Sequence, residues 1–295
     1  MQWNIGFANY NIAEIIREKR NDLKFKWFPI EGNSKSFADP FIFKSADKKL
    51  HVIYEEFSMI DLKKYGTIVL SILNEDFTPC FNKEILDSKT HSSYPFTLSE
   101  NNETYVIPES SRRRKVSCYQ FDFVSNSLIN EKIIIDKLPL LDSTIFRYNN
   151  KFWLFATLGD HEFDHSKLYI YYADSMFGEY KPHINNPVKE GLNGTRPAGN
   201  IITVDNELYR PAQNCKEYYG ESITINKIIT LNENEFKEEA YLQITADKES
   251  IYSEGIHTIN VLDDIIVVDG IKMIFMPFKK MKLFFQKKIK SKKQA

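Results

Sequence analysis

The stretch of sequence that decides the fold reads Ala38-Asp39-Pro40-Phe41-Ile42-Phe43, continuing into the polar turn Ala46-Asp47-Lys48-Lys49 and a second apolar run at 50–56. Both apolar runs are rich in the aromatic and β-branched residues that favour strands, and the residues between them are typical of a tight turn. The stretch therefore predicts a β-hairpin entered through a short motif that contains an acid and a proline.

The same unit recurs four more times along the chain. The later copies begin Ser93-Tyr94-Pro95-Phe96, Leu141-Asp142-Ser143-Thr144, Arg196-Pro197-Ala198-Gly199 and Ile256-His257-Thr258-Ile259. Second strands are expected at 50–56, 104–108, 152–157, 208–211 and 265–269, and third strands at 67–73, 116–123, 168–172 and 222–229. A spacing of about 47 to 60 residues is the size of a four-stranded propeller blade. We therefore predict an all-β fold, a five-bladed β-propeller over residues 1–270.

Two segments depart from this strand pattern. Residues 12–23 have a helical period, and the tail 271–295 predicts a short amphipathic basic helix. In the tail, an apolar stripe is flanked by lysines; its members are Ile274, Phe278, Met281, Phe285 and Ile289. Such a helix typically lies on an anionic membrane surface. A solvated basic tail, or one docked on the acidic remainder of the chain, is the alternative.

The near-neutral charge of the chain conceals an asymmetry. Lys and Arg number 39 against 40 Asp and Glu, but nine lysines and no acid lie in 271–295, so residues 1–270 carry 30 − 40 = −10. A body of this charge gives no reason to expect nucleic acid as a partner. The sequence has no signal-peptide pattern at its start and no stretch of 18 apolar residues. We expect a cytoplasmic protein, peripheral at the inner face of the membrane.

Three cysteines, at positions 80, 118 and 215, are widely spaced and odd in number. This pattern fits buried thiols in a reducing compartment better than a disulfide framework or a zinc site. No G-x-G, Asp-x-Asp, C-x-x-C or G-x-S-x-G motif occurs. We predict no metal site and no cofactor, with a nucleotide sugar entering as substrate.

A propeller brings the starts of its innermost strands together at one end of the central axis, which we call the mouth. The five copies place Asp39, Tyr94, Asp142, Arg196 and His257 there. Two or three converging carboxylates are what the cleavage or formation of a glycosidic bond needs, one as acid and another as base or nucleophile. The alternative is that these aspartates cap turns or accept backbone N–H groups.

Polar residues also interrupt the predicted second strands and their continuations, namely Glu55, Glu56, Glu109, Arg210 and Gln213. Arg196 and Arg210 offer planar donors suited to a carboxylate or a diphosphate. Glu109 and Glu221 compete for the role of further catalytic carboxylate beside Asp39 and Asp142. His257 could be a base, a phosphate contact, a contact to a metal-bound water or a core histidine, and His183 could equally order its loop.

The ordered series of motifs resembles the propeller domain at the N-terminus of plant glucosamine inositolphosphorylceramide transferases, over roughly residues 3–270. It includes Ala38-Asp39-Pro40, Ile107-Pro108-Glu109, Leu141-Asp142-Ser143, Asn186-Pro187-Val188, Tyr209-Arg210-Pro211-Ala212-Gln213 and Tyr219-Gly220. A similar domain accompanies some bacterial sugar formyltransferases. The chain is more distantly similar to the five-bladed furanosidases that include glycoside hydrolase family 43.

The furanosidase resemblance implies a base Asp in the first blade, a pKa-tuning Asp in the third and an acid Glu in the fourth. Asp39 and Asp142 match the first two by position. Glu221 is the best match for the third, although its Tyr-Gly-Glu context is not the hydrolase pattern, and Glu109 belongs to the transferase-like pattern. We expect Tyr94, His183, Arg196, Arg210, Gln213, Tyr219 and His257 to contact substrate.

The leading prediction is a glycosyltransferase of bacterial surface polysaccharide biosynthesis, such as lipopolysaccharide or capsule. It would move a sugar from a nucleotide donor to a lipid-linked or oligosaccharide acceptor. A furanosidase-type glycoside hydrolase is the second interpretation, and a non-catalytic sugar-binding module is the third.

Overall fold

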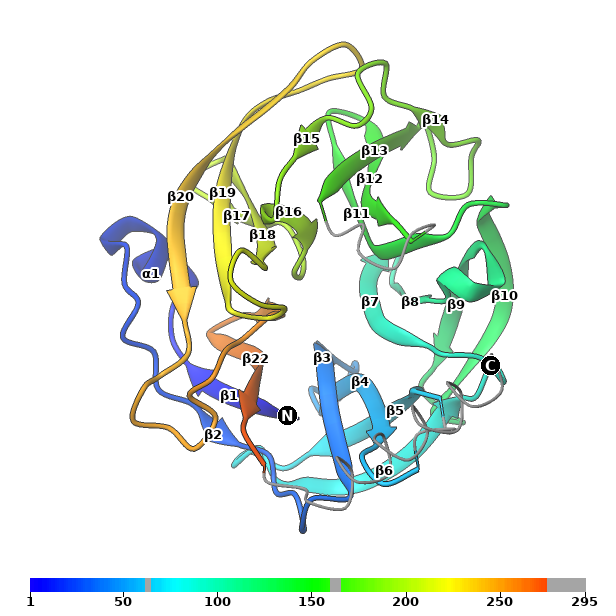
Figure 1. The fold of residues 1–295 in the computed structure, drawn as a ribbon. Coiled ribbons are helices and arrows are strands. Elements are labelled where there is room, and N and C mark those ends of the chain that lie inside the picture. The colour runs from blue at the N-terminus through cyan, green and yellow to red at the C-terminus, as the bar shows by residue number, and fades with distance from the viewer. Residues whose placement is uncertain (62–64, 160–165, 275–295) are drawn as a thin grey trace, which may run out of the picture.

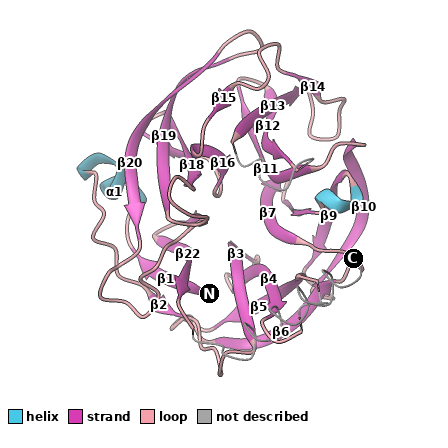
Figure 2. Cartoon of the chain, viewed as in Figure 1, coloured by secondary structure: helices cyan, strands magenta, loops and turns pink. Residues whose placement is uncertain are grey.

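The computed structural model of the chain describes residues 1–61, 65–159 and 166–274, and its strands form five sheets arranged around a central axis (Figures 1 and 2). The predicted five-bladed β-propeller is confirmed. The amphipathic helix was expected in the tail 271–295; Ile271 and Lys272 instead end the last strand of the propeller, and residues 275–295 lie outside the described residues. Among the residues that the structure describes, no helix is long and apolar enough to cross a membrane.

Each blade is an antiparallel sheet, and its innermost strand lies nearest the axis. From the axis outward, blade one contains β3 (Lys35–Lys44), β4 (Leu50–Ser58), β5 (Thr67–Leu73) and β6 (Pro79–Leu86). Blade two contains β7 (Ser93–Glu100), β8 (Glu103–Glu109), β9 (Lys115–Asp122) and β10 (Ser127–Asp136). Blade three contains β11 (Leu140–Tyr148), β12 (Lys151–Leu158) and β13 (Lys167–Ala173), with β14 (Lys181–Pro182) and β15 (Lys189–Glu190) both paired to β13.

The last two blades are less regular. In blade four, β16 (Asn193–Pro197) and β17 (Ile202–Val204) both pair with β18 (Glu207–Asn214), which is followed by β19 (Ser222–Leu231) and β20 (Phe236–Thr245). Blade five joins β21 (Ile259–Leu262) and β22 (Ile265–Lys272) to β1 (Gln2–Asn9) and β2 (Lys26–Trp27) from the start of the chain. The β1–β22 ladder runs from Gln2 opposite Lys272 to Asn9 opposite Ile265, so the N-terminal segment closes the ring.

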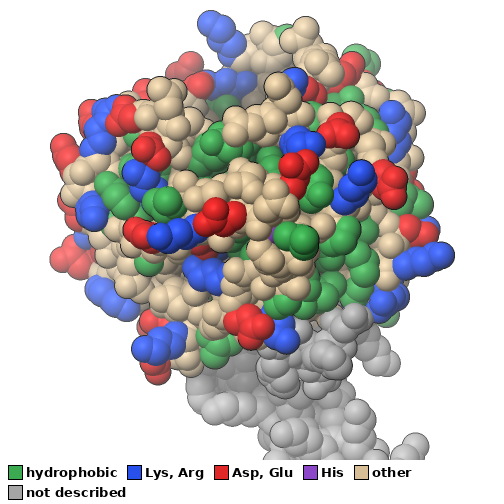
Figure 3. Space-filling model, turned by 90° about the horizontal axis from the view of Figure 1, so that it is seen from above, with side chains coloured by type: hydrophobic (Ala, Val, Ile, Leu, Met, Phe, Trp, Pro, Cys, Tyr) green, Lys and Arg blue, Asp and Glu red, His purple; other side chains and the backbone are tan. Residues whose placement is uncertain are grey.

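The apolar core lies between blades. Ile5 and Phe7 of blade five pack with Phe37 and Val52 of blade one, and comparable clusters fill the other four junctions. The inner strands are buried on both faces, whereas about half of the residues of the outermost strands β6, β10 and β20 are exposed, and most of these are polar. Lysine, arginine and acidic side chains alternate over the side of the molecule seen in Figure 3, as expected of a solvated rim.

Helix α1 (Ile12–Glu18) is shorter than the predicted 12–23. Its N-terminus is capped by the Asn11 side chain, which accepts from the backbone N–H groups of Ala13 and Glu14. The helix ends because Lys19 takes a left-handed conformation at φ 52°.

The expectation of three buried thiols was wrong for one of them. Cys118 and Cys215 are buried, but Cys80 is exposed because it lies on β6, the outermost strand of blade one.

Candidate active site

A repeated backbone distortion builds the centre of the site. The ladders of the inner strands β3, β7 and β11 each slip where Asp39, Tyr94 and Asp142 lie, and these residues have left-handed φ angles of 53°, 38° and 51°. A bulge lets an inner strand re-aim one side chain without ending the sheet. A left-handed conformation costs a non-glycine residue roughly 1–2 kcal/mol, and its recurrence in three blades points to function.

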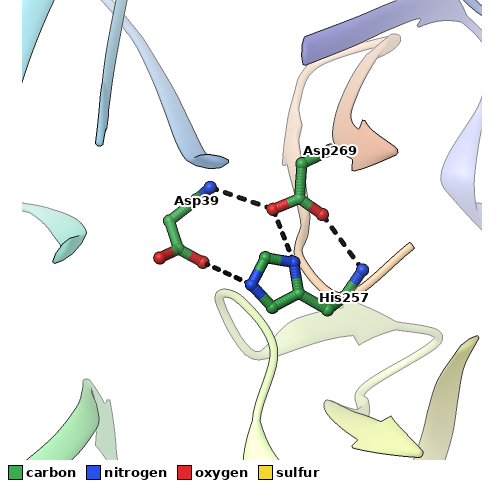
Figure 4. Close-up of side chains that lie close together, drawn as sticks. All are labelled: Asp39, His257 and Asp269. Atoms are coloured by element: carbon green, nitrogen blue, oxygen red, sulfur yellow. Dashed lines mark hydrogen bonds and ion pairs between the residues drawn. The ribbon is translucent and has the colours of Figure 1, made fainter. Parts of the chain in front are cut away.

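Asp39 is held among residues of blade five (Figure 4). Its Oδ1 accepts from the Thr258 hydroxyl at 2.7 Å and lies 3.4 Å from Nε2 of His257. Its Oδ2 accepts from the backbone N–H of Tyr94 at 3.2 Å. Burial raises the pKa of Asp39, while the neighbouring imidazole of His257 acts in the opposite direction.

Asp269 completes this group. Its carboxylate accepts from the backbone N–H groups of Asp39, His257 and Thr258 at 2.9, 3.0 and 3.0 Å. Nδ1 of His257 lies 2.7 Å from Asp269 Oδ2, an ion-pair contact without the direction of an in-line hydrogen bond. Burial alone would lower the pKa of His257, but Asp269 and Asp39 together outweigh burial and raise it. The imidazole is therefore favoured in its charged form.

Asp142 has a different setting although it occupies the equivalent position in blade three. Both of its oxygens accept from the Arg196 guanidinium, through Nε and through Nη2 at 3.1 Å, and the Gln213 amide donates at 3.0 Å. Burial raises the pKa of Asp142 and Arg196 opposes that shift. Because three N–H donors point at these oxygens and a guanidinium stays charged, we take Asp142 as ionised at neutral pH.

Glu55, on β4, is an acid whose surroundings favour the protonated form, in contrast to Asp142. Its side chain is buried, and burial together with Asp39, Glu109, Asp142 and Asp269 raises its pKa well above the ordinary 4.5. Glu55 Oε1 lies 3.6 Å from Nδ1 of His91. Such a carboxyl group keeps its proton at a pH where Asp142 has lost its own, and two acids split in this way can act as proton donor and proton acceptor.

Glu55, His91 and His257 border a cavity of about 410 Å³. Its walls come from blades one, two, four and five, and include Trp3, Glu55, His91, Tyr219 and His257. The Trp3 ring packs on His257 with centroids 4.1 Å apart, and Tyr219 meets the same imidazole at 5.2 Å. Aromatic faces beside carboxyl groups form a surface suited to a sugar ring, whose C–H face is apolar and whose hydroxyls are polar.

Asp39, His257 and Asp269 also form the group of described residues whose ligand atoms come close enough together for a metal ion, within 4.8 Å of one another. Both ring nitrogens of His257 already contact these two carboxylates. A metal bound to His257 would therefore have to displace one of these contacts, so the present geometry describes a charge cluster rather than an open coordination site.

The chain resembles known proteins in sequence, over about 70% of its length, and in fold. Residues 29–262 match the family described as "Glucosamine inositolphosphorylceramide transferase 1, N-terminal". The chain belongs to this family. It is 32% identical over 217 residues to the Oryza sativa subsp. japonica glucosamine inositolphosphorylceramide transferase 1, and 33% identical over 210 residues to the Arabidopsis thaliana protein of that name.

These matches cover 71% and 70% of this chain but only 29% and 27% of the plant proteins. Among solved structures, a thermostable family-43 glycoside hydrolase has a TM-score of 0.54 at 10% identity, covering 70% of this chain and 76% of that one. A family 117 glycoside hydrolase from Zobellia galactanivorans has a TM-score of 0.52 at 12% identity, covering 94% and 93%. The resemblance inferred from the motifs is thereby confirmed, and the hydrolases share the fold.

In this family member, several predicted site residues meet at the mouth. Asp39, Asp142, Arg196, His257 and Gln213 form the buried cluster, and Tyr219 forms a wall of the cavity. Glu109 lies beside the buried cluster, where its Oε2 is 4.0 Å from Nη2 of Arg196. Tyr94 is buried deeper, and its hydroxyl accepts from Gly199 N at 2.7 Å and contacts Thr144 at 2.8 Å, so it links blades two, three and four.

Three other predicted site residues are placed elsewhere. The buried Arg210 pairs with Glu238 on β20 and donates to the carbonyl groups of Gly194 and Thr195, which leaves no N–H fork for a donor phosphate. Nε2 of His183 lies 3.0 Å from the Asn232 carbonyl, so this imidazole orders its loop. The Glu221 carboxylate accepts from Glu217 N and does not line the cavity.

Sequence reasoning assigned no role to four residues of the site. Asp269 had a visible signal, since it is the one charged residue in the apolar run Ile265-Ile266-Val267-Val268-Asp269-Gly270. Glu55 was noted as a polar interruption of a strand, but its proton affinity follows only from the neighbours that the fold supplies. Trp3 and His91 stand outside the repeated positions, so no pattern could identify them.

Proposed function

We propose that this site transfers a sugar from a nucleotide donor to a hydroxyl of a lipid-linked or oligosaccharide acceptor, in the biosynthesis of bacterial surface polysaccharide. The observation that carries the proposal is the group of buried carboxyl groups around His257: Asp39 contacts its imidazole, and Glu55 and His257 line a cavity with aromatic walls. The plant relatives of the family are named as transferases. The donor is consumed as substrate, so this scheme involves no bound cofactor.

In this proposal, Asp39 is the base. The Thr258 hydroxyl and the Tyr94 backbone fix its orientation, and an acceptor hydroxyl within reach would give its proton to Asp39 as the new bond forms. The neighbouring carboxylates of Asp142 and Asp269 stabilise the positive charge that develops at the anomeric carbon. Glu55, still protonated, hydrogen-bonds or protonates the departing oxygen. Arg196 acts through Asp142 as a positioning residue.

Hydrolysis is the second candidate, because a specific observation favours it. A protonated Glu55 is most useful when the leaving group is a sugar oxygen, which departs poorly without a proton, whereas a diphosphate departs readily. With water in place of the acceptor, the same base and acid would cleave a furanoside. The fold shared with glycoside hydrolases is compatible with this function.

One experiment separates these functions. The chain is incubated with a panel of nucleotide sugars, with and without oligosaccharide acceptors, and with aryl furanosides, while released nucleotide and free sugar are measured. Transfer predicts nucleotide release that depends on acceptor. Free sugar from furanosides without donor turnover would establish the hydrolase instead. Failure to turn over any substrate, with sugar binding unchanged by Asp39→Asn and Asp142→Asn, would overturn catalysis and leave a binding module.

The proposal also includes a location, cytoplasmic and peripheral at an anionic inner membrane face. The supporting observation is topological: β22 ends at Lys272 opposite Gln2, at the end of the propeller where Asp39 and His257 lie. The described chain therefore ends on the mouth side, and the lysine-rich residues 275–295 follow it in sequence. Exposed apolar residues on loops and chain ends of that side would assist contact with lipid; they include Ile60, Tyr65, Leu192, Tyr218, Ile251 and Met273.

A further inference from the structure

The rim of the cavity carries a cation that the scheme above does not use. Arg112 lies in the short 3-10 turn Ser111–Arg113 between β8 and β9, and its side chain borders the cavity. Its guanidinium carbon lies 5.6 Å from the centre of the Tyr65 ring. Among the described residues, Arg112 forms no ion pair.

The two arginines that follow it are engaged elsewhere. Arg113 donates to the Tyr119 hydroxyl at 3.2 Å and to Glu131 at 3.0 Å. Arg114 donates to the Lys137 carbonyl at 3.2 Å. Arg112 is therefore the member of this run whose charge is directed to the cavity, and it is exposed to an incoming ligand.

The other ionisable groups that line the cavity do not substitute for Arg112. His257 is held between Asp39 and Asp269. Burial lowers the pKa of His91, which favours its neutral form, and Glu55 keeps its proton because its own pKa is raised. In the part of the chain that the structure describes, the cavity thus has the buried, protonated Glu55 in its wall and one available permanent cation, Arg112, at its rim. A ligand that matches this polarity has a neutral sugar end and an anionic end.

We propose that Arg112 binds a phosphate group attached to the sugar substrate, while the sugar ring lies against Trp3 and Tyr219. This inference rests on the proposed sugar-handling function and adds the substrate class, a phosphorylated saccharide. The phosphate could belong to the nucleotide donor or to a phosphodiester head group of the acceptor. Arg112 presents planar N–H donors that suit either, and stacking on Tyr65 restricts its motion.

The test measures binding of two phosphate probes by titration calorimetry, uridine diphosphate for the donor and inositol 1-phosphate for the acceptor. Uridine and inositol serve as phosphate-free controls. Arg112→Gln is expected to weaken at least one phosphate probe by about 10-fold or more, with little effect on its phosphate-free control. Arg112→Lys should recover part of the affinity, and the nearby Arg114→Gln should bind as the unaltered chain does.

If Arg112→Gln loses affinity for uridine diphosphate alone, Arg112 binds the phosphate of the donor. If it loses affinity for inositol 1-phosphate alone, Arg112 binds the phosphate of the acceptor. The proposal is overturned if neither probe binds the unaltered chain, or if Arg112→Gln and Arg114→Gln bind both probes equally well. The Asp39→Asn variant separates a failure of the phosphate-binding proposal from a failure of the proposed catalysis. Phosphate binding that depends on Arg112, without any turnover that depends on Asp39, would retain this inference and reject the catalytic one.

Discussion

Asp39 and Asp142 occupy equivalent bulges but have different surroundings. Asp142 receives three N–H donors from Arg196 and Gln213, which leaves it little capacity to accept another proton. Asp39 receives one hydroxyl and one backbone N–H and borders a charged imidazole. The same residue type in the same repeat position therefore supports two roles, a base and a fixed charge.

The protonated state of Glu55 leads to a prediction about stability and pH. A carboxyl group with a raised pKa in the folded chain contributes stability that is complete below its unfolded value near 4.5 and is lost as the pH rises through the folded value. Glu55→Gln removes this loss, so the variant should retain its unfolding midpoint better than the unaltered chain as the pH rises above about 5. Urea unfolding of both proteins at a series of pH values measures these midpoints. If the midpoints of the two proteins change with pH in parallel, Glu55 is already ionised in the folded chain and the prediction is wrong.

Arg210 gives a second prediction at the same scale. It is almost fully buried and pairs with Glu238, so Arg210→Met leaves a buried carboxylate with Lys189 alone. We expect a loss of roughly 3–5 kcal/mol in the free energy of unfolding, with sugar binding by the folded fraction unchanged. Arg147→Gln, which breaks an exposed pair with Glu100, is the control and should cost under about 1 kcal/mol. If Arg210→Met lowers the sugar affinity of the folded fraction, Arg210 takes part in substrate binding and the prediction is wrong.

At the level of elements, hairpins were predictable and bulges were not. Apolar runs separated by polar turns located the second and third strands closely, because alternating burial and turn chemistry are local properties. The bulges at Asp39, Tyr94 and Asp142 depend on which neighbouring blade receives each side chain, a long-range property. The shortened α1 has a similar cause, since Lys19 adopts a left-handed conformation that the helical period does not reveal.

Blade four has a glycine with a positive φ close to its neighbour in the ring, blade five. Gly199 has φ 140°, and a Cβ at this position would overlap the carbonyl oxygen of Ile259 in blade five. Gly199→Ala should therefore destabilise the fold by more than the roughly 0.5–3 kcal/mol of an ordinary substitution. Thermal unfolding tests this, with Gly32→Ala as a control that also has a positive φ but no neighbouring atoms within 4 Å. Equal losses in the two variants would mean that the blade contact is unimportant.

At the scale of the whole molecule, the repeat predicted the ring and the convergence of Asp39, Asp142, Arg196 and His257. The sequence did not indicate that β1 completes blade five, which is what brings Trp3 to the cavity. It also did not show that Arg210 pairs with Glu238 or that His183 contacts the Asn232 carbonyl, because a polar residue in a motif can serve the fold as readily as the site. Contacts between blades decide which of these it does.

The lysine tail belongs to this scale because its effect is electrostatic. Removing residues 275–295 should leave the propeller folded and abolish cosedimentation with vesicles that contain phosphatidylserine, since about 1 kcal/mol per nearby lysine is lost. Raising the salt concentration should weaken binding of the full chain. A truncated chain that still sediments with these vesicles would contradict the proposed role of the tail.

The central claim is that the sugar reacts beside Asp39, and turnover tests it most directly. The measurement is kcat/KM for the best substrate of the nucleotide-sugar and furanoside panel, in the unaltered chain, in Asp39→Asn and in Asp263→Asn. Asp263 shares the left-handed φ of 53° but lies exposed in a turn at the other end of blade five. We predict a loss of about 10²–10⁴-fold for Asp39→Asn and no change for Asp263→Asn. Equal activity in all three proteins, or none in the unaltered chain, would contradict the account.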